Sequence, residues 1–445
     1  MKLILISPPF GEKGQKSIVA PIAPPALEYL AGLTKKIRPD AEIELIDANR
    51  EDIDTTRLSA DMVGFTVHTV QAPWTYRTAD LIRARNIPVV LGGIHVSALP
   101  EEAMPHADAV VVGEAESVWA QILTDMEKGT LKKLYHGERL PLNNLPHPET
   151  GLFKSKYVLG SFFTARGCPR RCRFCAVNKY FGGKVRLRPI PEVVAEIASS
   201  KRRLFWNLDD NCWGISVPRS IELYREMSVN ISGKYWFGMG DLGSLDHPRS
   251  EELLKWARRS GMLYVRVGWE TSNPATLEYF NAHVKQGRNR IDAIKKIRAA
   301  GIDVMLFVIV GSRQDTEKDF EQVIRLSEDL DIAVRPVMMT PLPETDLFPE
   351  YAPHLLPGQA WDRFDGYRAV FSHPTMTPAE REQWLTRLWN EMYTLPKILR
   401  RLTKIGLPGF PLTHLVSFMI QYSESKPFRQ NPEVFPTGKK TNPDQ

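Results

Sequence analysis

The sequence predicts an α/β protein in three parts: an N-terminal doubly wound parallel sheet, a central partial (β/α)6 barrel and a C-terminal helical region. Short apolar runs alternate with helical patterns twice along the chain, once on each side of a polar, proline-containing stretch. The length of 445 residues exceeds that of one ordinary domain. The last part of the chain has helical periodicity without strand patterns.

The first part covers residues 1–130. Apolar strands separated by helical crossovers are typical of a Rossmann-like sheet with helices on both faces. In such sheets ligands bind beyond the carboxyl ends of the strands. Strands are expected at Lys2–Ile6, Glu42–Asp47, Met62–Thr66, Pro88–Leu91 and Ala109–Val112, and helices at Pro25–Thr34 and Tyr76–Arg85.

Small and polar residues gather at these strand ends. Glycine permits close approach of a backbone to a large planar ligand, and hydroxyl groups can satisfy its polar rim. No GxGxxG motif follows the first strand, which disfavours a dinucleotide. The histidines among them also fit an ordinary hydrogen-bonded loop. The candidate binding residues are Thr66, His68, Gly92, Gly93, His95, Gly113 and Glu114.

Residues 131–155 are polar and broken by prolines, as expected of a linker. The alternation then resumes over 156–345, where right-handed crossovers curl a sheet toward a barrel. Residues 346–422 are expected to be helical, and the polar tail 423–445 to be disordered. Barrel strands are expected at Val158–Thr164, Leu204–Leu208, Tyr235–Met239, Tyr264–Gly268, Asp303–Val310 and Ala333–Met338.

Three of the four cysteines of the chain, Cys168, Cys172 and Cys175, form a CxxxCxxC motif directly after the first of these strands. Thiolates this close can converge on one metal centre. No fourth Cys or His stands at zinc spacing, so a zinc site is disfavoured. Three thiolates leave one corner of an iron–sulfur cubane open. The isolated Cys212 is expected to be a packed core residue.

The motif, with an aromatic residue before its last cysteine, resembles the cluster motif of radical S-adenosylmethionine (SAM) enzymes. The stretch Gly92-Gly93-Ile94-His95 and the later Gly113-Glu114-Ala115-Glu116 resemble the cobalamin-binding domain that precedes many of these barrels. The resemblance implies a [4Fe–4S] cluster on the three cysteines, SAM on its open iron, and cobalamin at the strand ends of the first part. The motif that supplies a histidine to cobalt in other cobalamin proteins is absent.

The same resemblance implies SAM contacts at the barrel strand ends. Acidic residues after the second strand would face the SAM amino group, and a carboxylate facing an ammonium is physically sensible. These acids also fit a structural role as helix caps. The residues implied are Asp209, Asp210, Glu270, Ser272 and Gly311.

The implied function is radical cleavage of SAM, with cobalamin, for C-methylation of a small metabolite or natural-product intermediate. The alternative is a radical reaction without methyl transfer, such as dehydration, ring formation or oxidation, in which the N-terminal domain need not bind cobalamin. A cofactor-binding sensor is a third, disfavoured reading. The expected partners are a small-molecule substrate and a one-electron donor of the flavodoxin or ferredoxin type.

Cysteine usage and an oxygen-sensitive cluster favour a reducing cytoplasm. The net charge of +6 is mild for this length, so no nucleic acid is expected. No apolar run approaches the length of a membrane span. The start of the chain is interrupted by prolines too early to resemble a signal peptide.

Overall fold

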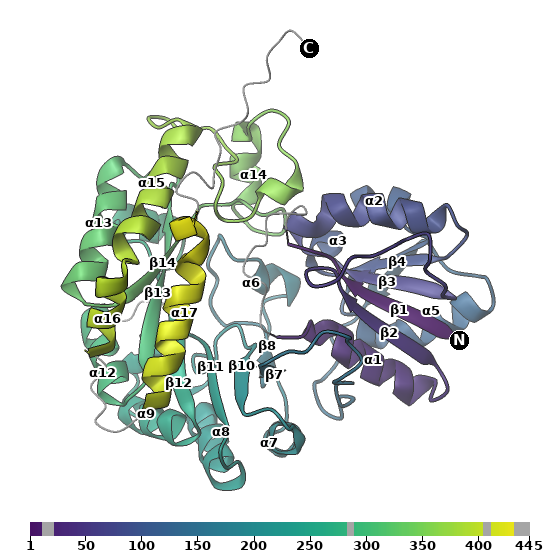
Figure 1. Cartoon of the computed structure of the whole chain (residues 1–445), viewed down its shortest axis with the longest axis horizontal. Helices are drawn as coiled ribbons and strands as arrows, with labels where there is room; N and C mark the ends of the chain where they lie inside the picture. The colour runs from purple at the N-terminus through teal and green to yellow at the C-terminus, as the bar shows by residue number, and fades with distance from the viewer. Residues whose placement is uncertain (11–21, 283–288, 404–410, 431–445) are drawn as a thin grey trace.

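The computed structural model describes residues 1–10, 22–282, 289–403 and 411–430. Two parallel sheets dominate it. In Figure 1 the N-terminal sheet lies to the right and the barrel to the left, with the C-terminal helices along the barrel's outer left side and across its front. Within the described residues no helix is long and apolar enough to cross a membrane.

The N-terminal sheet has the order β2-β1-β3-β4-β5-β6 with every pairing parallel. Its central strands are buried on both faces, which explains their continuous apolar sequences. The order reverses direction beside β1, the kind of point at which doubly wound sheets bind ligands. The strands are β1 (Lys2–Ser7), β2 (Glu42–Asp47), β3 (Met62–Thr66), β4 (Val89–Gly92), β5 (Ala109–Gly113) and β6 (Leu134–Gly137).

Two cores form on the two faces of this sheet. Leu3 and Leu5 pack with α1 (Pro25–Ile37) and α5 (Trp119–Glu127), whereas alternate residues such as Ile4 pack with helices on the opposite face. This alternation is the strand period of two. The opposite face carries α2 (Ala72–Arg83), α3 (Ile94–Ala98) and α4 (Pro100–Ala103).

The expected N-terminal strands are confirmed, with two corrections. β6 lies inside the stretch 131–155 that reads as a linker, and it extends the sheet. Only Tyr135 of β6 is buried, so this short edge strand lacks an apolar run. α2 begins at Ala72 rather than Tyr76, because Pro73 occupies an early helical position, where its missing N–H is not needed.

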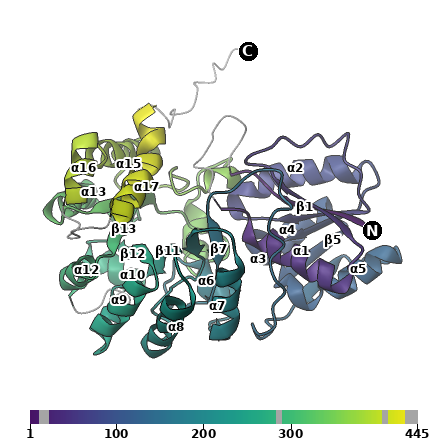
Figure 2. The ribbon, with the colours of Figure 1, turned by 60° about the horizontal axis from the view of Figure 1, so that its bottom comes forward.

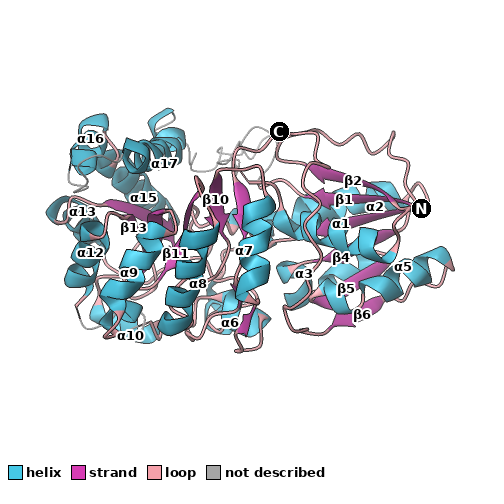
Figure 3. Ribbon diagram, turned by 90° about the horizontal axis from the view of Figure 1, so that it is seen from below, coloured by secondary structure: helices cyan, strands magenta, loops and turns pink. Residues whose placement is uncertain are grey.

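The second sheet has the order β14-β13-β12-β11-β10-β7, again all parallel, and it curves into a partial barrel. Helices cover its convex side and form the largest core with alternate strand residues. Figure 3 shows α7, α8, α9 and α12 in a row along that side. The strands are β7 (Gly160–Phe162), β10 (Leu204–Asn207), β11 (Tyr235–Gly240), β12 (Met262–Glu270), β13 (Asp303–Val310) and β14 (Ala333–Met338), and the helices are α7 (Ile190–Ser199), α8 (Val217–Asn230), α9 (Ser250–Arg259), α12 (Arg290–Ala299) and α13 (Glu317–Asp329).

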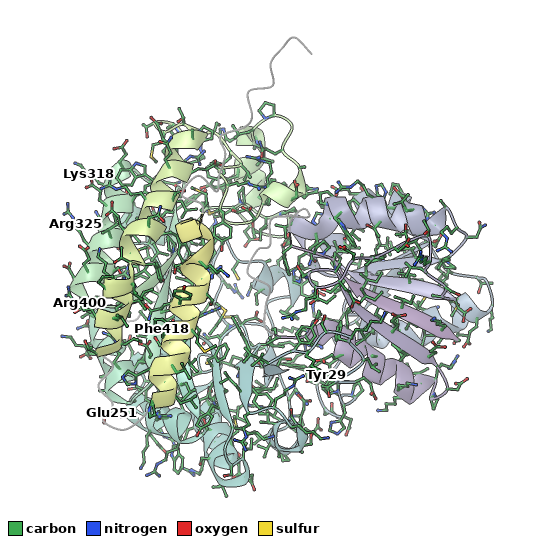
Figure 4. The ribbon with its side chains drawn as sticks, in the orientation of Figure 1. Tyr29, Glu251, Lys318, Arg325, Arg400 and Phe418 are labelled. Atoms are coloured by element: carbon green, nitrogen blue, oxygen red, sulfur yellow. The ribbon has the colours of Figure 1, made fainter. Side chains whose placement is uncertain are left out.

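The concave side of the barrel is covered in part by α17 (Pro411–Gln430). Val416 packs with Phe237 and Met305, which alternate along their strands with the residues of the convex core. Glu424 bridges Arg266 on β12 and Arg335 on β14. Figure 1 shows α17, in yellow, running alongside these strands, and Figure 4 labels Phe418 on it.

The C-terminal region is helical, as expected, and one boundary is corrected. Thr377 and Glu380 form the expected capping box at the start of α15 (Pro378–Met392), and α16 (Leu395–Thr403) follows. α17 continues to Gln430, so disorder from residue 423 is wrong for residues 423–430. Burial of Glu424 between two arginines stabilises this polar stretch. The rest of the tail lies outside the described residues.

Candidate active site

The cysteine loop leaves the carboxyl end of the first barrel strand. β8 (Ala165–Arg166) follows β7, and Gly167 then turns the chain with φ of 94°. A Cβ at this position would lie 2.4 Å from the carbonyl oxygen of Lys184. The turn therefore requires glycine. The loop ends at Cys175, directly before α6 (Ala176–Tyr180), on the face where βα barrels place their chemistry.

Hydrogen bonds from distant segments fix the path of this loop. The Arg173 amide donates to the carbonyl of Phe280 at 3.0 Å, and its own carbonyl accepts from the Leu347 amide at 3.2 Å. Arg170 donates through Nε to Oδ2 of Asp241 at 2.9 Å. The loop is thus tied to the ends of three barrel segments, which holds its backbone in place.

The donor set of the loop fits an iron–sulfur cubane. Cys168 and Cys175 are partly exposed and Cys172 is buried. In the described part of the chain, no three His, Cys, Asp or Glu side chains gather around a single ion position. A cubane instead takes each thiolate at a different iron, so its ligands are spread over several corners. Cys212 lies in the barrel core as expected, where burial raises the pKa of its thiol.

Asp209 holds the strand that leads into the loop. Its carboxylate accepts from the Thr164 amide at 2.6 Å, from the Thr164 hydroxyl at 2.5 Å and from the Ala165 amide at 3.1 Å. The side chain is buried, and burial raises its pKa. These bonds account for Asp209 as an anchor of the first barrel strand. A contact with SAM stays a prediction for this residue.

Asp210 is placed differently from its neighbour. Oδ2 accepts from the Gly167 amide at 3.2 Å, directly before the first cysteine, and the residue lines a cavity described below. Burial, together with the nearby Asp209 carboxylate, raises the pKa of Asp210 to about 6. Burial and the Asp209 charge destabilise the ionised carboxylate of Asp210, and a cation bound beside the cysteine loop would relieve this. Asp210 is therefore a good candidate for binding a cation.

Glu270 has an unusual backbone at the carboxyl end of β12. Its φ is 61°, and the pairing with β13 shifts register between Gly268 and Glu270. A left-handed φ costs a non-glycine residue roughly 1–2 kcal/mol, and such strain clusters at functional sites. Ser272 accepts a hydrogen bond from Trp269 Nε1 at 3.1 Å. Both remain predicted SAM contacts.

Gly311 follows the end of β13 with φ of 78°. A Cβ there would lie 2.5 Å from the sulfur of Met338, so the tight turn requires glycine. Its carbonyl accepts from Arg381 Nη1 at 3.4 Å. These contacts explain the glycine through packing, and its role as a SAM contact stays a prediction.

A cavity of about 330 Å³ lies at the carboxyl ends of β3, β4 and β5. It is bounded on one side by the N-terminal sheet and α1, and on the other by residues near the cysteine loop. Most of the lining is apolar, which suits the body of a large organic ligand. The residues that line it from the barrel side are Phe163, Ala165, Arg166, Tyr180, Phe181, Leu208 and Asp210.

Glycines line this cavity. Gly92 lines it, and a Cβ there would meet only ordinary contacts, the nearest being 3.7 Å from Val111. Gly93 and Gly113 have φ of 107° and 86°, and a Cβ on either would lie within 2.6 Å of backbone. Thr66 and Glu114 also line the cavity. The cavity thus gathers five of the seven candidate binding residues of the N-terminal part, and its largely apolar lining suits one face of a large organic ligand such as cobalamin.

The two histidines lie outside that lining. His68 is exposed at the surface, and desolvation by the surrounding protein, together with the nearby His95, lowers its pKa. His95 is fully buried, with Nε2 3.4 Å from Glu102 and its ring against Trp361. Nδ1 has no hydrogen-bond partner within the described structure. A role for either histidine beside cobalamin stays a prediction.

An ion network crosses from the cavity to the cysteine loop. Glu114 accepts from Arg166 Nη1 at 2.8 Å and from Arg186, and Glu116 accepts from Arg166 Nη2 at 2.6 Å. Glu114 is buried. Sequence reasoning missed Glu116, Arg166 and Arg186 as site residues. The one available signal was the position of Arg166, two residues before the first cysteine.

Comparisons with known proteins agree with this geometry. The family model described as the B12 binding domain matches residues 16–123. Over 398 residues the chain is 28% identical to the bacteriochlorophyllide d C-8(2)-methyltransferase of Chlorobaculum tepidum, covering 84% of this chain and 86% of that protein. The B12-binding match and the CxxxCxxC loop thus stand on one chain. The chain is similar in sequence and fold to cobalamin-dependent radical SAM enzymes.

Other known proteins also resemble the chain over most of its length. The anaerobic magnesium-protoporphyrin IX monomethyl ester cyclase of Rubrivivax gelatinosus is 27% identical over 424 residues, 85% of this chain and 74% of that protein. The radical SAM methyltransferase TsrM of Kitasatospora setae superposes with a TM-score of 0.67 at 16% identity, covering 97% of this chain and 99% of that chain. The structural likeness shows that the whole two-domain fold of this radical SAM enzyme is shared.

Proposed function

We propose that this radical SAM enzyme is a cobalamin-dependent C-methyltransferase acting on a small molecule. The observation that carries the proposal is the shared boundary of two sites. Arg166 and Asp210 line the cavity at the N-terminal strand ends, and both also border the cysteine loop. Methyl transfer to carbon by this chemistry needs both cofactors close to one substrate.

When bound, the cluster and SAM supply a carbon-centred radical, and cobalamin supplies the methyl group. The residues of the chain bind and orient these groups. Cys168, Cys172 and Cys175 would hold three irons and leave the fourth for SAM. Asp210 and Glu270 would orient SAM from the carboxyl ends of β10 and β12. The apolar cavity with Gly92 and its neighbouring glycines would hold cobalamin.

The side chains on the concave wall of the barrel favour a large apolar substrate. Trp206 and Phe307 are only partly buried there, and Met239 is 36% exposed, although all three lie on central strands. Exposed apolar surface inside a barrel needs a ligand or water to cover it. This apolar wall would suit a ring system. Named relatives act on bacteriochlorophyllide d and on magnesium-protoporphyrin IX monomethyl ester, and a hopanoid C-2 methylase is 25% identical over 280 residues.

Isotope-labelled SAM tests the methyltransferase proposal. The anaerobic protein is reconstituted with iron, sulfide and hydroxocobalamin, reduced, and given SAM with a deuterated methyl group and a metalloporphyrin acid as the trial substrate. We expect both 5′-deoxyadenosine and S-adenosylhomocysteine, with the label retained in a methylated product. Labelled SAM converted without any S-adenosylhomocysteine would contradict methyl transfer.

A second candidate is a radical oxidation or cyclisation without methyl transfer. The similarity to the Rubrivivax cyclase favours it, since that relative matches as much of the chain as the methyltransferase does. This candidate predicts 5′-deoxyadenosine alone in the same assay. Either reaction would draw single electrons from a flavodoxin- or ferredoxin-like donor, and we place both in a reducing cytoplasm.

A further inference from the structure

The cysteine loop is enclosed by a hairpin that carries two arginines side by side. β8 pairs antiparallel with β9 (Arg186–Leu187), and Arg166 stands directly opposite Arg186. Their side chains are 19% and 14% exposed. Like charges directly opposite on paired strands are destabilising, more so when partly buried. The barrel sequence that carries the loop is therefore electrostatically unfavourable by itself.

The N-terminal domain supplies the charges that the hairpin needs. Both carboxylates come from one turn, Glu114-Ala115-Glu116, directly after β5. Arg166 reaches Glu114 at 2.8 Å and Glu116 at 2.6 Å, while Arg186 pairs with Glu114. Two acids thus neutralise two arginines. Arg166 also lies over the ring of Phe163, with its guanidinium carbon 5.1 Å from the centroid.

The same turn forms a wall of the cavity. Gly113, Glu114, Ala115 and Glu116 all line it. A ligand that fills the cavity would hold the turn in place, and the turn would hold Arg166, two residues before Cys168. A rigid chain of packed and charged groups therefore joins the two sites.

We infer that the Glu114–Glu116 turn is a positioning element that couples occupancy of the cobalamin cavity to the order of the cluster loop. Glu114 and Glu116 act through Arg166 and Arg186 and touch no reacting atom in this role. The part of the inference that concerns cobalamin rests on the proposed function. The effect of the turn on the cluster loop does not depend on it.

A second interdomain contact provides a matched control. Tyr29 on α1 donates to Oε1 of Glu196 on α7 at 2.7 Å, and Arg188 pairs with Oε2 at 2.9 Å. Figure 4 labels Tyr29 at the junction of the two parts, and Figure 2 shows α1 and α7 facing each other across it. This contact is also buried and charged, but its acid is Glu196 on α7, which pairs with Arg188 after β9 and not with Arg166 or Arg186. Glu196→Gln weakens domain docking without uncovering Arg166.

The test measures loss of iron from the reconstituted cluster to an anaerobic chelator, bathophenanthroline disulfonate, with and without hydroxocobalamin. We expect the Glu114→Gln/Glu116→Gln variant to lose iron about fivefold faster than the native chain, the scale of coupling between contacting groups. Hydroxocobalamin should slow iron loss from the native chain and from Glu196→Gln, but not from the double variant. Should the double variant fail to fold, Glu116→Gln alone, at the more exposed acid, replaces it.

Equal rates of iron loss from the native chain and from the Glu114→Gln/Glu116→Gln variant would overturn the inference. Faster loss from Glu196→Gln to the same degree would also overturn it, because general loosening of the domains would then explain the effect. Cobalt analysis of the same samples separates the proposals. Absence of bound cobalt in the native chain contradicts the cobalamin function, whereas the iron-loss difference without cobalamin still decides the role of the turn.

Discussion

Replacing Gly167 by alanine tests whether the turn before Cys168 determines the cluster site. The new Cβ would lie 2.4 Å from the Lys184 carbonyl oxygen, whereas ordinary contacts begin near 3.4 Å, so the backbone must move by about 1 Å. Overpacking of this kind costs roughly 1–3 kcal/mol. The positive φ of 94° adds roughly 1–2 kcal/mol. Together these give about 2–5 kcal/mol at the base of the loop.

Gly233 provides the control for this change. Its φ is 67°, and a Cβ there meets nothing within 4 Å, so Gly233→Ala carries only the backbone term of roughly 1–2 kcal/mol. Calorimetry of the two variants, with iron analysis after reconstitution, separates the cost of the close contact from the cost of the positive φ. We expect Gly233→Ala to retain iron and Gly167→Ala to lose most of it. Full iron retention in Gly167→Ala, with a melting temperature equal to that of Gly233→Ala, would refute the reasoning.

Three further predictions concern single side chains. Glu270→Ala should weaken SAM binding in titration calorimetry while the iron content is kept; unchanged affinity would leave the left-handed backbone of Glu270 without a SAM role. Asp210→Asn should raise the melting temperature of the cofactor-free protein at pH 7.5 and leave it unchanged near pH 3. The pKa of Asp210 in the folded state, about 6, lies above its ordinary value of 3.8, so between these pH values the folded state holds a proton that the unfolded state has released. The native protein therefore loses up to roughly 3 kcal/mol of stability as the pH rises from about 4 to 6. An equal gain at both pH values would contradict this sign. Alanine at any of the three loop cysteines should abolish iron and visible absorbance, whereas the core variant Cys212→Ala should keep both; the loop variants are Cys168→Ala, Cys172→Ala and Cys175→Ala.

The sequence predicted most strands of both sheets because each has a buried, apolar pattern of its own. β6 was not predicted because it is a short edge strand in which only Tyr135 is buried. The end of α17 was not predicted for a different reason. Its polar residues are held by tertiary partners, since Glu424 lies between Arg266 and Arg335, and no local pattern reveals such partners.

The residues of the candidate site also fall into two groups, those that the sequence could predict and those that it could not. Cys168 and its two companions are a local spacing, and glycines such as Gly92 mark strand ends, so both could be read directly. The roles of Asp209 and Glu114 depend on how the chain folds back: Asp209 bonds to Thr164, forty-five residues away, and Glu114 pairs with Arg166, fifty-two residues away. Contacts between separate strand ends and separate domains leave no periodic signal in the sequence.

The central claim is that one chain holds two cofactors at a shared boundary. It is tested most directly by anaerobic purification with hydroxocobalamin, followed by iron and cobalt analysis of the same sample. We predict about four irons and about one cobalt per chain, the content of one cubane and one corrin. Four irons without cobalt would contradict the account, because the cavity at Gly92 and Gly113 would then belong to some other ligand.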